Sequence, residues 1–488
     1  MAICGGGASA VLLLESLART SGRRIIVEVI EPRAQLARGV AYSTECPLHL
    51  LNVPVGRMSS ADDSTSFLRW LQEAPGRSAR HWGADDFAPR ERYGRYLEWL
   101  LERVSASPNI DFTWHRTAAL QLTRAPSEWR IELARGLAVR ADVVVLATGA
   151  APAALLGEHL PGPSRQLVLE DPWDTGAKHR IPADAPVLLA GSGLTAVDVA
   201  LELLYARHHR GPVIAFSRRG LWPRPHGART PPEPAILERI ARAASVRELL
   251  SLARELAASD PSGAAWRGFM DELRRTAGTI WGALDAAQRR QFMRHVRPFW
   301  EAHRHRMAPA VYARLTTALA DGRLTLLRGR LESVAPGNSP NLLEVKLRQG
   351  VGARTLQVAR LINCTGPAVG LRQSANPLLR NLLRDGLAQP DALGLGMAMA
   401  AGSRLVSASG RVQPSLFALG APARAARFEL TAIPEIAAQA RAIGQEILAL
   451  QPERASPDSS PTVSAVAGRL GSVTTAVSPT CSVRAASA

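Results

Sequence analysis

The hexapeptide GGGASA at residues 5–10 recurs in design as GSGLTA at residues 191–196. Both have the form G-x-G-x-x-A, and each lies between a short apolar run and a segment with apolar residues at helical spacing. In such a turn the first glycine permits a tight bend, the second lets the backbone approach a phosphate, and the third small residue lets helix and strand pack closely. The repeat therefore predicts two βαβ units that each bind a dinucleotide.

The helix that follows each turn gives the physical reason for phosphate binding. Its first backbone N–H groups have no partners within the helix, and the helix dipole adds positive potential at the same end. The residues expected to form the two turns are Gly5, Gly7 and Ala10 in the first unit, and Gly191, Gly193 and Ala196 in the second.

The last residue of the second strand in each βαβ unit indicates which dinucleotide that unit binds. The run at 25–31 ends in Glu31, which can accept hydrogen bonds from ribose hydroxyls but would repel a 2′-phosphate. The run at 212–219 ends in Arg218 and Arg219, whose guanidinium groups match a phosphate. We therefore expect FAD at the first unit and NADPH at the second.

Two further apolar runs end in Thr-Gly, namely DVVVLATG, which closes on Thr148 and Gly149, and LINCTG, which closes on Thr365 and Gly366. Each is expected to be a buried strand whose end brings the backbone close to a cofactor, where the chain crosses between domains.

A third strand ending in glycine is expected at 415–420 (SLFALG), closing on Gly420. A helix should follow over 431–450, beginning at Thr431 with Pro434 in its first turn. We expect its N-terminus to face the pyrimidine edge of the flavin, where its dipole would stabilise the anionic reduced flavin.

The pattern as a whole predicts an α/β fold with two Rossmann-like dinucleotide-binding domains and a helical insertion. Helices are expected at 66–70 and 93–104, and a small β-meander at 110–133. The expected boundaries are 1–165 and 355–450 for the two parts of the FAD domain, 166–232 and 311–354 for those of the NADPH domain, 233–310 for the insertion, and 451–488 for a disordered tail.

Composition narrows the function classes. The net charge of +17 comes from arginine, because lysine occurs only at 178 and 346, and the arginines are scattered rather than gathered into the patch that nucleic-acid binding requires. The cysteines at 4, 46, 364 and 481 are isolated, which argues against a zinc ribbon and against a disulfide reductase with a close cysteine pair. Isolated cysteines suit a reducing compartment. No apolar run is long enough to span a bilayer. We therefore expect a cytoplasmic protein.

Other charged residues have plainer interpretations. Asp198 and Glu202 lie four apart on the helix of the second unit and are expected on a solvated face. His303 and His305 lie two apart, with no carboxylate or cysteine to complete a ligand set, so no metal site is expected. Arg304 or Arg306 could bind an anionic substrate or the nicotinamide nucleotide, although a solvated helix end is the default interpretation. No residue is assigned a catalytic role, since a flavin itself would carry the chemistry.

Several of these segments together resemble the FAD/NAD(P)-binding proteins related to bacterial FAD-dependent urate hydroxylase and aspartate N-monooxygenase, over about residues 1 to 450. They are CGGGASAV (4–11), IEPRAQLARGVAYST (30–44), HLLNVPVGRMS (49–59), FAPRERYGRYL (87–97), LLAGSGLTAVD (188–198), HRHRMAP (303–309), NCTGP (363–367) and ELTAIPEIAAQA (429–440).

The resemblance implies that NADPH reduces FAD, that the reduced flavin reacts with molecular oxygen, and that a C4a-hydroperoxide transfers one oxygen atom to the substrate. By the same resemblance Gly5, Gly7 and Glu31 would bind FAD, and Asn52 with Met58 would lie near the isoalloxazine. The segment APARAA after Gly420 departs from the pattern, since it lacks a second glycine.

Three functions follow as hypotheses. The first is an NADPH-dependent flavin monooxygenase that acts on a small polar nitrogenous compound. The second is a flavin oxidoreductase that passes electrons to a quinone or a protein partner without inserting oxygen. The third is a redox sensor or scaffold that binds FAD without turnover.

Overall fold

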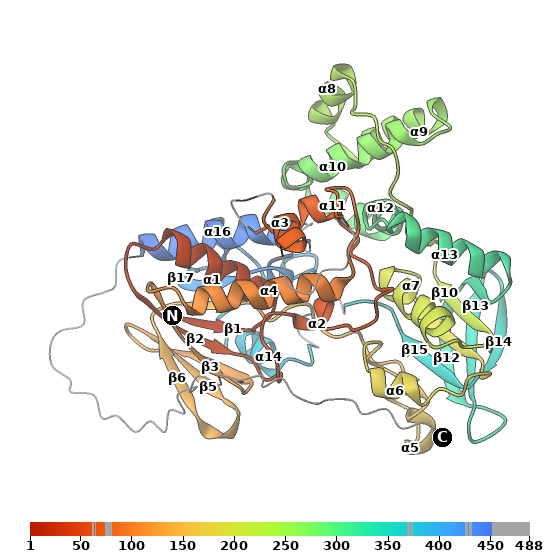
Figure 1. Cartoon of the computed structure of the whole chain (residues 1–488), viewed down its shortest axis with the longest axis horizontal. Helices are drawn as coiled ribbons and strands as arrows, with labels where there is room; N and C mark the ends of the chain where they lie inside the picture. The colour runs from red at the N-terminus through yellow and green to blue at the C-terminus, as the bar shows by residue number, and fades with distance from the viewer. Residues whose placement is uncertain are drawn as a thin grey trace, which may run out of the picture. The chain divides into compact units, whose positions relative to one another are not determined.

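The computed structural model describes residues 1–60, 63, 65–73, 81–367, 371, 374–424, 428 and 432–450. The chain divides into two units, Met1–Gln451 and Pro452–Ala488. The architecture described here is that of the first unit (Figure 1). The tail predicted at 451–488 lies outside the described residues.

The first sheet has six strands. Their bounds are Arg404–Val406 (β16), Val412–Ala418 (β17), Val144–Leu146 (β7), Ala2–Cys4 (β1), Ile25–Ile30 (β2) and Ile110–His115 (β3), in that order across the sheet. All neighbours run parallel except β16, which is antiparallel to β17. The strands are apolar because both faces of the sheet are covered.

Three helices cover one face of this sheet, where they share one apolar core with alternate strand residues such as Ile3 and Val145. Figure 1 shows them side by side. The opposite face, which includes Ala2 and Val144, packs against a three-stranded antiparallel sheet and a further helix. The three helices are Ala8–Thr20 (α1), Arg90–Ser105 (α4) and Ile433–Ala449 (α16), and the covering elements are Ala119–Arg124 (β4), Trp129–Leu133 (β5), Ala138–Ala141 (β6) and Pro377–Arg384 (α14).

The second sheet repeats this design with five parallel strands. Their bounds, across the sheet, are Leu324–Arg328 (β11), Val213–Ser217 (β10), Val187–Ala190 (β9), Arg360–Asn363 (β15) and Val168–Leu169 (β8). One face packs against Leu194–Leu201 (α7), which continues as a π-helical turn to Ala206, and Pro309–Ala320 (α13). The other face packs against the antiparallel strands Arg330–Pro336 (β12), Leu343–Gln349 (β13) and Gly352–Val358 (β14).

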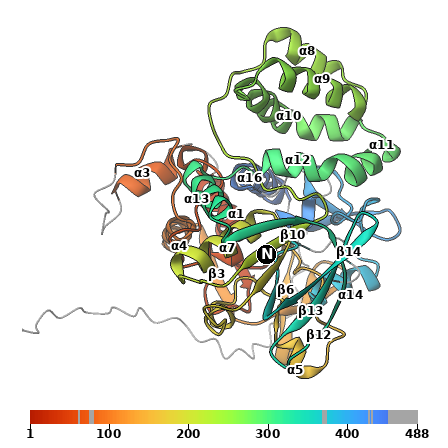
Figure 2. The ribbon, with the colours of Figure 1, turned by 90° about the vertical axis from the view of Figure 1, so that its right-hand side faces the viewer.

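A group of helices interrupts the second sheet's chain between β10 and α13. It consists of Pro234–Arg242 (α8), Val246–Ser259 (α9), Ala264–Ala283 (α10), Ala286–Gln291 (α11), a π-helical turn at Phe292–Val296 and Arg297–Arg304 (α12). Local signals fix its helix starts, since the Ser245 and Asp285 side chains accept hydrogen bonds from the N–H groups of Glu248 and Gln288. In Figures 1 and 2, α8, α9 and α10 lie farther from the two sheets than α12 does.

The short helices of the described chain are Gly39–Tyr42 (α2), Ser66–Glu73 (α3), Gly162–Arg165 (α5) and Thr175–His179 (α6). No described helix is long and apolar enough to cross a membrane.

Two predicted assignments differ from the structure. The meander expected at 110–133 begins later, because β3 pairs in parallel with β2 and is the edge strand of the first sheet. The run at 360–363 was placed with the second part of the FAD domain, but β15 pairs with β9 and β8 in the second sheet. Both strands are apolar runs, and apolar periodicity does not tell which partner a strand will find.

A buried network of charges joins the helix α7 to the first half of the chain, and it corrects the solvated face predicted for Asp198 and Glu202, which are both buried. Arg90, the first residue of α4, lies 2.8 Å from Asp198, and the Lys178 ammonium lies 2.6 Å from the Glu202 carboxylate. Arg207 also pairs with Glu202 at 2.7 Å. A single helix cannot reveal these partners, because they come from distant parts of the sequence.

This network makes the fold sensitive to acid. Burial alone would raise the pKa of Glu202, but Lys178 and Arg207 outweigh it, and the pKa lies below the ordinary value of 4.5. A lowered carboxyl pKa contributes stability that is present above the unfolded pKa and is lost as the pH falls through the folded pKa. Burial raises the pKa of Asp198, against the opposing effect of Arg90, so Asp198 does not share in this contribution.

The two lysines of the chain provide a matched test of the network. We expect Lys178→Met to lower the free energy of unfolding by about 3 kcal/mol, because it leaves the buried Glu202 with one cationic partner fewer. Lys346→Met removes an exposed pair with Glu332 and should cost less than about 1 kcal/mol. Urea unfolding followed by tryptophan fluorescence measures both. Equal losses for the two variants would contradict the role assigned to the network.

Candidate functional site

Three strand ends of the first sheet meet at the first glycine turn. Gly5 follows β1 with φ of +113°, and a Cβ there would lie 2.3 Å from the Ala147 carbonyl oxygen, at the end of β7. Thr148 and Gly149 continue from that point. Gly420, after β17, has φ of +73°, and a Cβ on it would lie 2.8 Å from the Ser9 hydroxyl oxygen. The predicted residues at the ends of β1, β7 and β17 are thus gathered at one edge of the sheet.

The start of α1 is arranged to hold an anion. Gly7 is the N-cap, and none of the described side chains caps the helix there. Ala10 is 1% exposed, so a larger side chain would separate the helix from the sheet. The Gly6 N–H donates to Glu31 Oε2 at 2.9 Å, and Glu31 Oε1 accepts from Arg33. The acid predicted to bind ribose is therefore fixed against the turn itself.

The hydroxyl of Thr148 indicates that a polar ligand belongs at this edge. Thr148 Oγ1 is buried, and no hydrogen-bond partner for it occurs in the described part of the chain. A buried hydroxyl without a partner costs free energy that a ligand oxygen would recover. Together with the glycine turn and Glu31, this observation fits the ribose and pyrophosphate of FAD.

The second turn has the same backbone geometry as the first at its glycines and the same contact with a neighbouring strand. Gly191 follows β9 with φ of +118°, and a Cβ there would also lie 2.3 Å from a carbonyl oxygen, that of Cys364 after β15. Thr365 and Gly366 follow, as Thr148 and Gly149 do in the first unit. Gly193 is the N-cap of α7, again without a cap from any side chain that the structure describes, and Ala196 is fully buried.

The two arginines predicted for NADPH lie directly after β10, at the same edge as Gly191. Arg218 and Arg219 are both exposed, and the Arg219 guanidinium lies 5.6 Å from the centre of the Phe299 ring, on α12. The Ser192 hydroxyl donates to Leu221 O at 2.6 Å, and its oxygen lies 2.7 Å from the Ser217 hydroxyl oxygen, within hydrogen-bond distance. These bonds hold the second turn against the segment that carries the arginines.

Asn52 and Met58, which the resemblance places near the isoalloxazine, lie in different surroundings. The Asn52 carbonyl accepts a hydrogen bond from His226 Nε2 at 3.0 Å, and Asn52 lines a pocket. Met58 is 2% exposed and packs in the core under α1 and α4. Only Asn52 is therefore placed to face a ligand.

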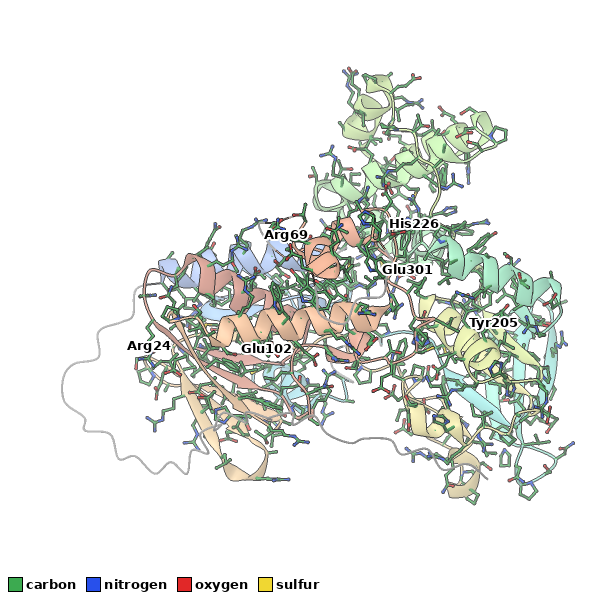
Figure 3. All side chains as sticks on the ribbon, in the orientation of Figure 1. Arg24, Arg69, Glu102, Tyr205, His226 and Glu301 are labelled. Carbon is green, nitrogen blue, oxygen red and sulfur yellow. The ribbon has the colours of Figure 1, made fainter. Side chains whose placement is uncertain are left out.

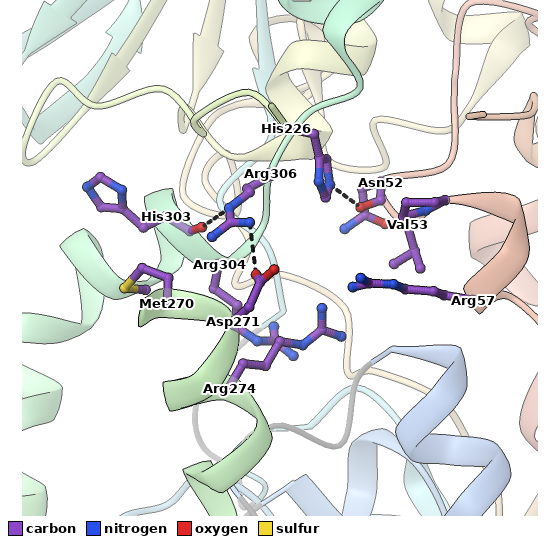
Figure 4. A pocket seen from close by; sticks show the side chains of 11 residues that line it. Asn52, Val53, Arg57, His226, Met270, Asp271, Arg274, His303, Arg304 and Arg306 are labelled. Carbon is purple, nitrogen blue, oxygen red and sulfur yellow. Dashed lines mark hydrogen bonds and ion pairs between the residues drawn. The ribbon is translucent and has the colours of Figure 1, made fainter. Parts of the chain in front are cut away.

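The pocket beside Asn52 lies where the insertion meets the first half of the chain (Figure 4). Arg57 points into it from one side, and Arg274, Arg304 and Arg306 from the other. In the view of Figure 3, His226 and Glu301 lie between α10 and α4, in the same crowded region. The residues that line the pocket are Asn52, Val53, Pro54, Arg57, His226, Met270, Asp271, Arg274, His303, Arg304 and Arg306.

This placement corrects the default interpretation of residues 303–306 as a solvated helix end. Arg306 is 6% exposed, and its guanidinium pairs with Asp271 at 2.8 Å and donates to the Arg267 and His303 carbonyls. Burial, more than the neighbouring Arg274, lowers the pKa of Arg304 to about 9.

The histidines of the region are neutral at pH 7. Burial lowers the pKa of His226 and of His303 to about 4, and nearby arginines add to the effect at His303. Burial and then Arg304 lower the pKa of His305 well below its ordinary value of 6.5. The positive charge of the pocket therefore comes from arginine. Within the described ranges, no group of His, Cys, Asp and Glu side chains is arranged to hold a metal ion.

Sequence reasoning missed Arg57, Asp271 and Arg274. Asp271 and Arg274 lie beside the buried apolar face of α10, which includes Met270 and Leu273, at positions where charged residues of a solvated helix flank are common. Nothing in the sequence around Arg57 distinguishes it from the many other arginines.

The start of α16 lies close to this pocket. Pro434 occupies the first turn, as predicted, and Glu435 pairs with Arg274 of α10 at 2.8 Å. The ion pair joins the insertion to the helix that was expected to face the flavin. Thr431 lies outside the described residues.

Comparison with known proteins agrees with this geometry. Residues 2–151 match a family described as FAD-NAD(P)-binding. No curated protein sequence matches the chain. Among solved structures, the chain resembles the Kutzneria sp. 744 ornithine N-hydroxylase, described with reduced FAD, NADP⁺ and L-ornithine, at 16% identity and a TM-score of 0.58, over 91% of this chain and 98% of the other.

Two further solved structures resemble the chain. One is the L-lysine 6-monooxygenase from Pseudomonas syringae, with 16% identity, a TM-score of 0.59, and 92% and 99% of the two chains covered. The other is the FAD-bound cadaverine monooxygenase of desferrioxamine biosynthesis from Erwinia amylovora, with 14% identity, a TM-score of 0.57, and 95% and 98% covered. At these identities the likeness shows a common fold. The predicted α/β fold class is confirmed, and the match of residues 2–151 to an FAD-NAD(P)-binding family agrees with the predicted resemblance.

Gly5 offers a direct test of the first turn. We expect Gly5→Ala to abolish FAD binding, because its Cβ would collide with the Ala147 carbonyl oxygen and force the turn open. Gly22→Ala is the matched control, since a Cβ at Gly22 meets no atom within 4 Å. The flavin absorbance of each purified protein, relative to protein concentration, measures the effect. A Gly5→Ala protein with full flavin content would show that the turn is structural only.

Proposed function

We propose that the protein is an FAD-dependent, NADPH-using monooxygenase that hydroxylates a nitrogen of a small nitrogenous substrate. The observation that carries the proposal is the repeated cradle, in which Gly5 and Gly191 each press against the carbonyl of a neighbouring strand at the edge of a parallel sheet. Two such cradles in one chain suit one bound and one exchanging dinucleotide.

The residues of the first cradle would bind FAD. The N–H groups at the start of α1 face its pyrophosphate, Glu31 accepts from the ribose hydroxyls, and the Thr148 hydroxyl gains the partner that it lacks. Gly149, Gly420 and the start of α16 at Pro434 would flank the rest of the cofactor. When bound and reduced, FAD supplies the two electrons with which molecular oxygen is activated.

The residues of the second cradle would bind NADPH. The N–H groups at the start of α7, after Gly193, face the pyrophosphate, and Thr365 with Gly366 bring backbone close to the nucleotide. Arg218 and Arg219, exposed beyond β10, would hold the 2′-phosphate. Exposure suits this role, because NADPH must enter and leave in each cycle.

The overall reaction balances with these components. One atom of O₂ enters an N–H bond of the substrate to give N–OH, and the other leaves as water. NADPH provides a hydride and becomes NADP⁺, and one proton is taken from solvent. The substrates named for the structural neighbours are amines, namely ornithine, lysine and cadaverine, which supports nitrogen as the atom oxygenated.

The thiols of the chain support oxygen transfer over dithiol electron transfer. Cys4, Cys46 and Cys364 are free. Burial raises the pKa of Cys4 to about 12 and raises those of Cys364 and Cys46 as well. Such thiols are poor nucleophiles, and free thiols suit a reducing, cytoplasmic location.

Isotope labelling tests the proposed reaction. The FAD-loaded protein is mixed with NADPH and isotopically labelled O₂ in the presence of a panel of amines and amino acids, and products are examined by mass spectrometry. We expect NADPH-dependent bleaching of the flavin and one labelled oxygen atom in the product. Bleaching with rapid electron transfer to a quinone, and no labelled product from any compound, would instead establish the electron-transfer alternative.

Arg218 tests the assignment of the second cradle. We expect Arg218→Ala to weaken NADPH binding by about 10- to 100-fold through loss of a charge-assisted contact, and to leave NADH binding nearly unchanged. Arg210→Ala is the control, because Arg210 is an equally exposed arginine that pairs with Asp184 before β10 begins, at the opposite end of the strand. The KM values for the two nucleotides in flavin reduction are the measurement. Equal losses for NADPH and NADH would refute the phosphate contact.

A further inference from the structure

The helical insertion forms a large apolar cavity that is partly open to solvent. It has a volume of about 760 Å³ and is lined by side chains of α9, α10, the π-helical turn and α12. Protein cores are packed with few voids larger than a water molecule, whereas pockets that hold organic ligands measure roughly 300–1,000 Å³. A cavity of this size is large enough to hold an organic ligand.

Aromatic rings form much of its wall, and one of them comes from outside the insertion. Phe428 stacks on Trp281 with ring centres 4.4 Å apart and meets Phe292 edge-on at 5.2 Å. Phe428 belongs in sequence to the segment between Gly420 and α16. The cavity is thus built jointly by the insertion and by the part of the chain expected to flank the flavin.

The cavity also adjoins the arginine pocket. Met270 and His303 line both spaces. Trp266 Nε1 donates to His303 Nδ1 at 2.8 Å, so the other ring nitrogen carries the proton of the neutral imidazole. At the boundary between the two spaces lie the thioether of Met270 and the neutral ring of His303. The lining is apolar on the side of the cavity and cationic on the side of the arginine pocket.

The arginine pocket is narrow and carries excess positive charge. Its volume is about 20 Å³, which suits a group no larger than a carboxylate, since one water needs roughly 10–15 Å³. Its described lining residues include four arginines and one acid, Asp271, which pairs with Arg306. Arg274 pairs with Glu435. Asp271 and Asp85 act on Arg57 through their charge, but no ion pair joins Arg57 to a carboxylate within the part of the chain that the structure describes.

We propose that the substrate is an amphipathic amino acid, with a bulky apolar side chain in the cavity of the insertion and its carboxylate held in the arginine pocket by Arg57. The inference rests on the proposed monooxygenase function and replaces the small polar compound expected from the sequence. A diamine would place a second cation beside the arginines without a carboxylate to offset it, and is excluded by repulsion.

The same arginines would prepare the nitrogen for reaction. An amine must lose its proton before its lone pair can accept an oxygen atom. Nearby positive charge disfavours the ammonium form and lowers the pKa of the amine. The arginines bind the substrate carboxylate, which places the adjacent amine close to their positive charge. The same residues would therefore bind the substrate and favour deprotonation of its amine.

Equilibrium binding to the FAD-loaded protein tests the proposal independently of turnover. The probes are 2-aminododecanoic acid, dodecylamine, aspartate and cadaverine, and isothermal titration calorimetry gives each Kd. We expect 2-aminododecanoic acid to bind at least about tenfold more tightly than dodecylamine, the value of one charge-assisted hydrogen bond. Aspartate and cadaverine should bind far more weakly, because neither fills the cavity.

Variants locate the two halves of the site. Ala277→Phe, which fills the cavity from α10, should weaken 2-aminododecanoic acid at least tenfold, and Ala253→Phe from α9 should do the same. Ala283→Phe adds the same ring to the exposed end of α10 and should have no effect. Arg57→Gln should abolish the preference over dodecylamine while dodecylamine itself binds as before. Flavin content confirms that each variant is folded.

The outcomes separate this inference from the proposed function. The inference is overturned if 2-aminododecanoic acid fails to bind, or if Ala277→Phe, Ala253→Phe and Ala283→Phe all bind it alike. In that case labelled oxygen in a cadaverine product would still support a monooxygenase. If 2-aminododecanoic acid binds tightly and the cavity variants weaken it, but no amine gives a labelled product, the proposed binding site is supported and the proposed monooxygenase function is refuted.

Discussion

The structure depends on two places where a backbone carbonyl occupies the space of a missing Cβ. Gly5 against Ala147 and Gly191 against Cys364 have the same φ within a few degrees and the same forbidden distance of 2.3 Å. Each contact sets how closely a crossing strand approaches the turn, and so determines where the helix N-terminus points. Because the contacts involve only backbone and an absent side chain, no other residue type can satisfy them. The two glycine turns are therefore built by close approach, and in the proposed function side chains such as Glu31 and Arg218 would adapt them to different ligands.

Two dinucleotides can react with each other only if the two sheets keep a fixed relative position. Buried ion pairs contribute to fixing that position. Asp198 and Glu202 lie on the helix that starts at the second cradle, while Arg90 begins α4 under the first sheet. Apolar packing tolerates small sliding motions, whereas a charge-assisted pair has a preferred geometry and a high cost of separation. His49 Nε2 lies 3.5 Å from the Glu202 carboxylate and 3.2 Å from the Asp198 backbone carbonyl, and connects the network to the segment that leads to Asn52. The geometry of the pocket is in this way linked to that of the second glycine turn.

The parts of the molecule that sequence reasoning reached are those encoded locally. The turns and the closing residues Glu31 and Arg218 carry their signal within one strand-helix-strand unit, and each helix of the insertion carries its own apolar periodicity. The partners of β3 and β15 were assigned wrongly, because an apolar run indicates burial without naming its neighbour. The charges of α7 were placed in solvent for the same reason, since Lys178 and Arg90 reach them only in the folded chain. Arg57 and Arg274 form a site through tertiary proximity alone, and in an arginine-rich sequence no local feature separates them from surface residues.

The arginine pocket and the apolar cavity illustrate how one fold can change substrate without altering its cofactor chemistry. The cradles at Gly5 and Gly191 lie on the sheets, but the cavity lies in an insertion that joins the second sheet's chain only at its two ends. Side chains of α9 and α10 can therefore vary in size without disturbing either nucleotide. The pocket is less free to change, because Arg274 is tied to the first turn of α16 by Glu435. An alteration of charge there would reach the helix expected to face the flavin. A change in the apolar part of the proposed substrate would therefore be accommodated by the insertion, whereas the arginine pocket is tied to α16 through Arg274 and Glu435.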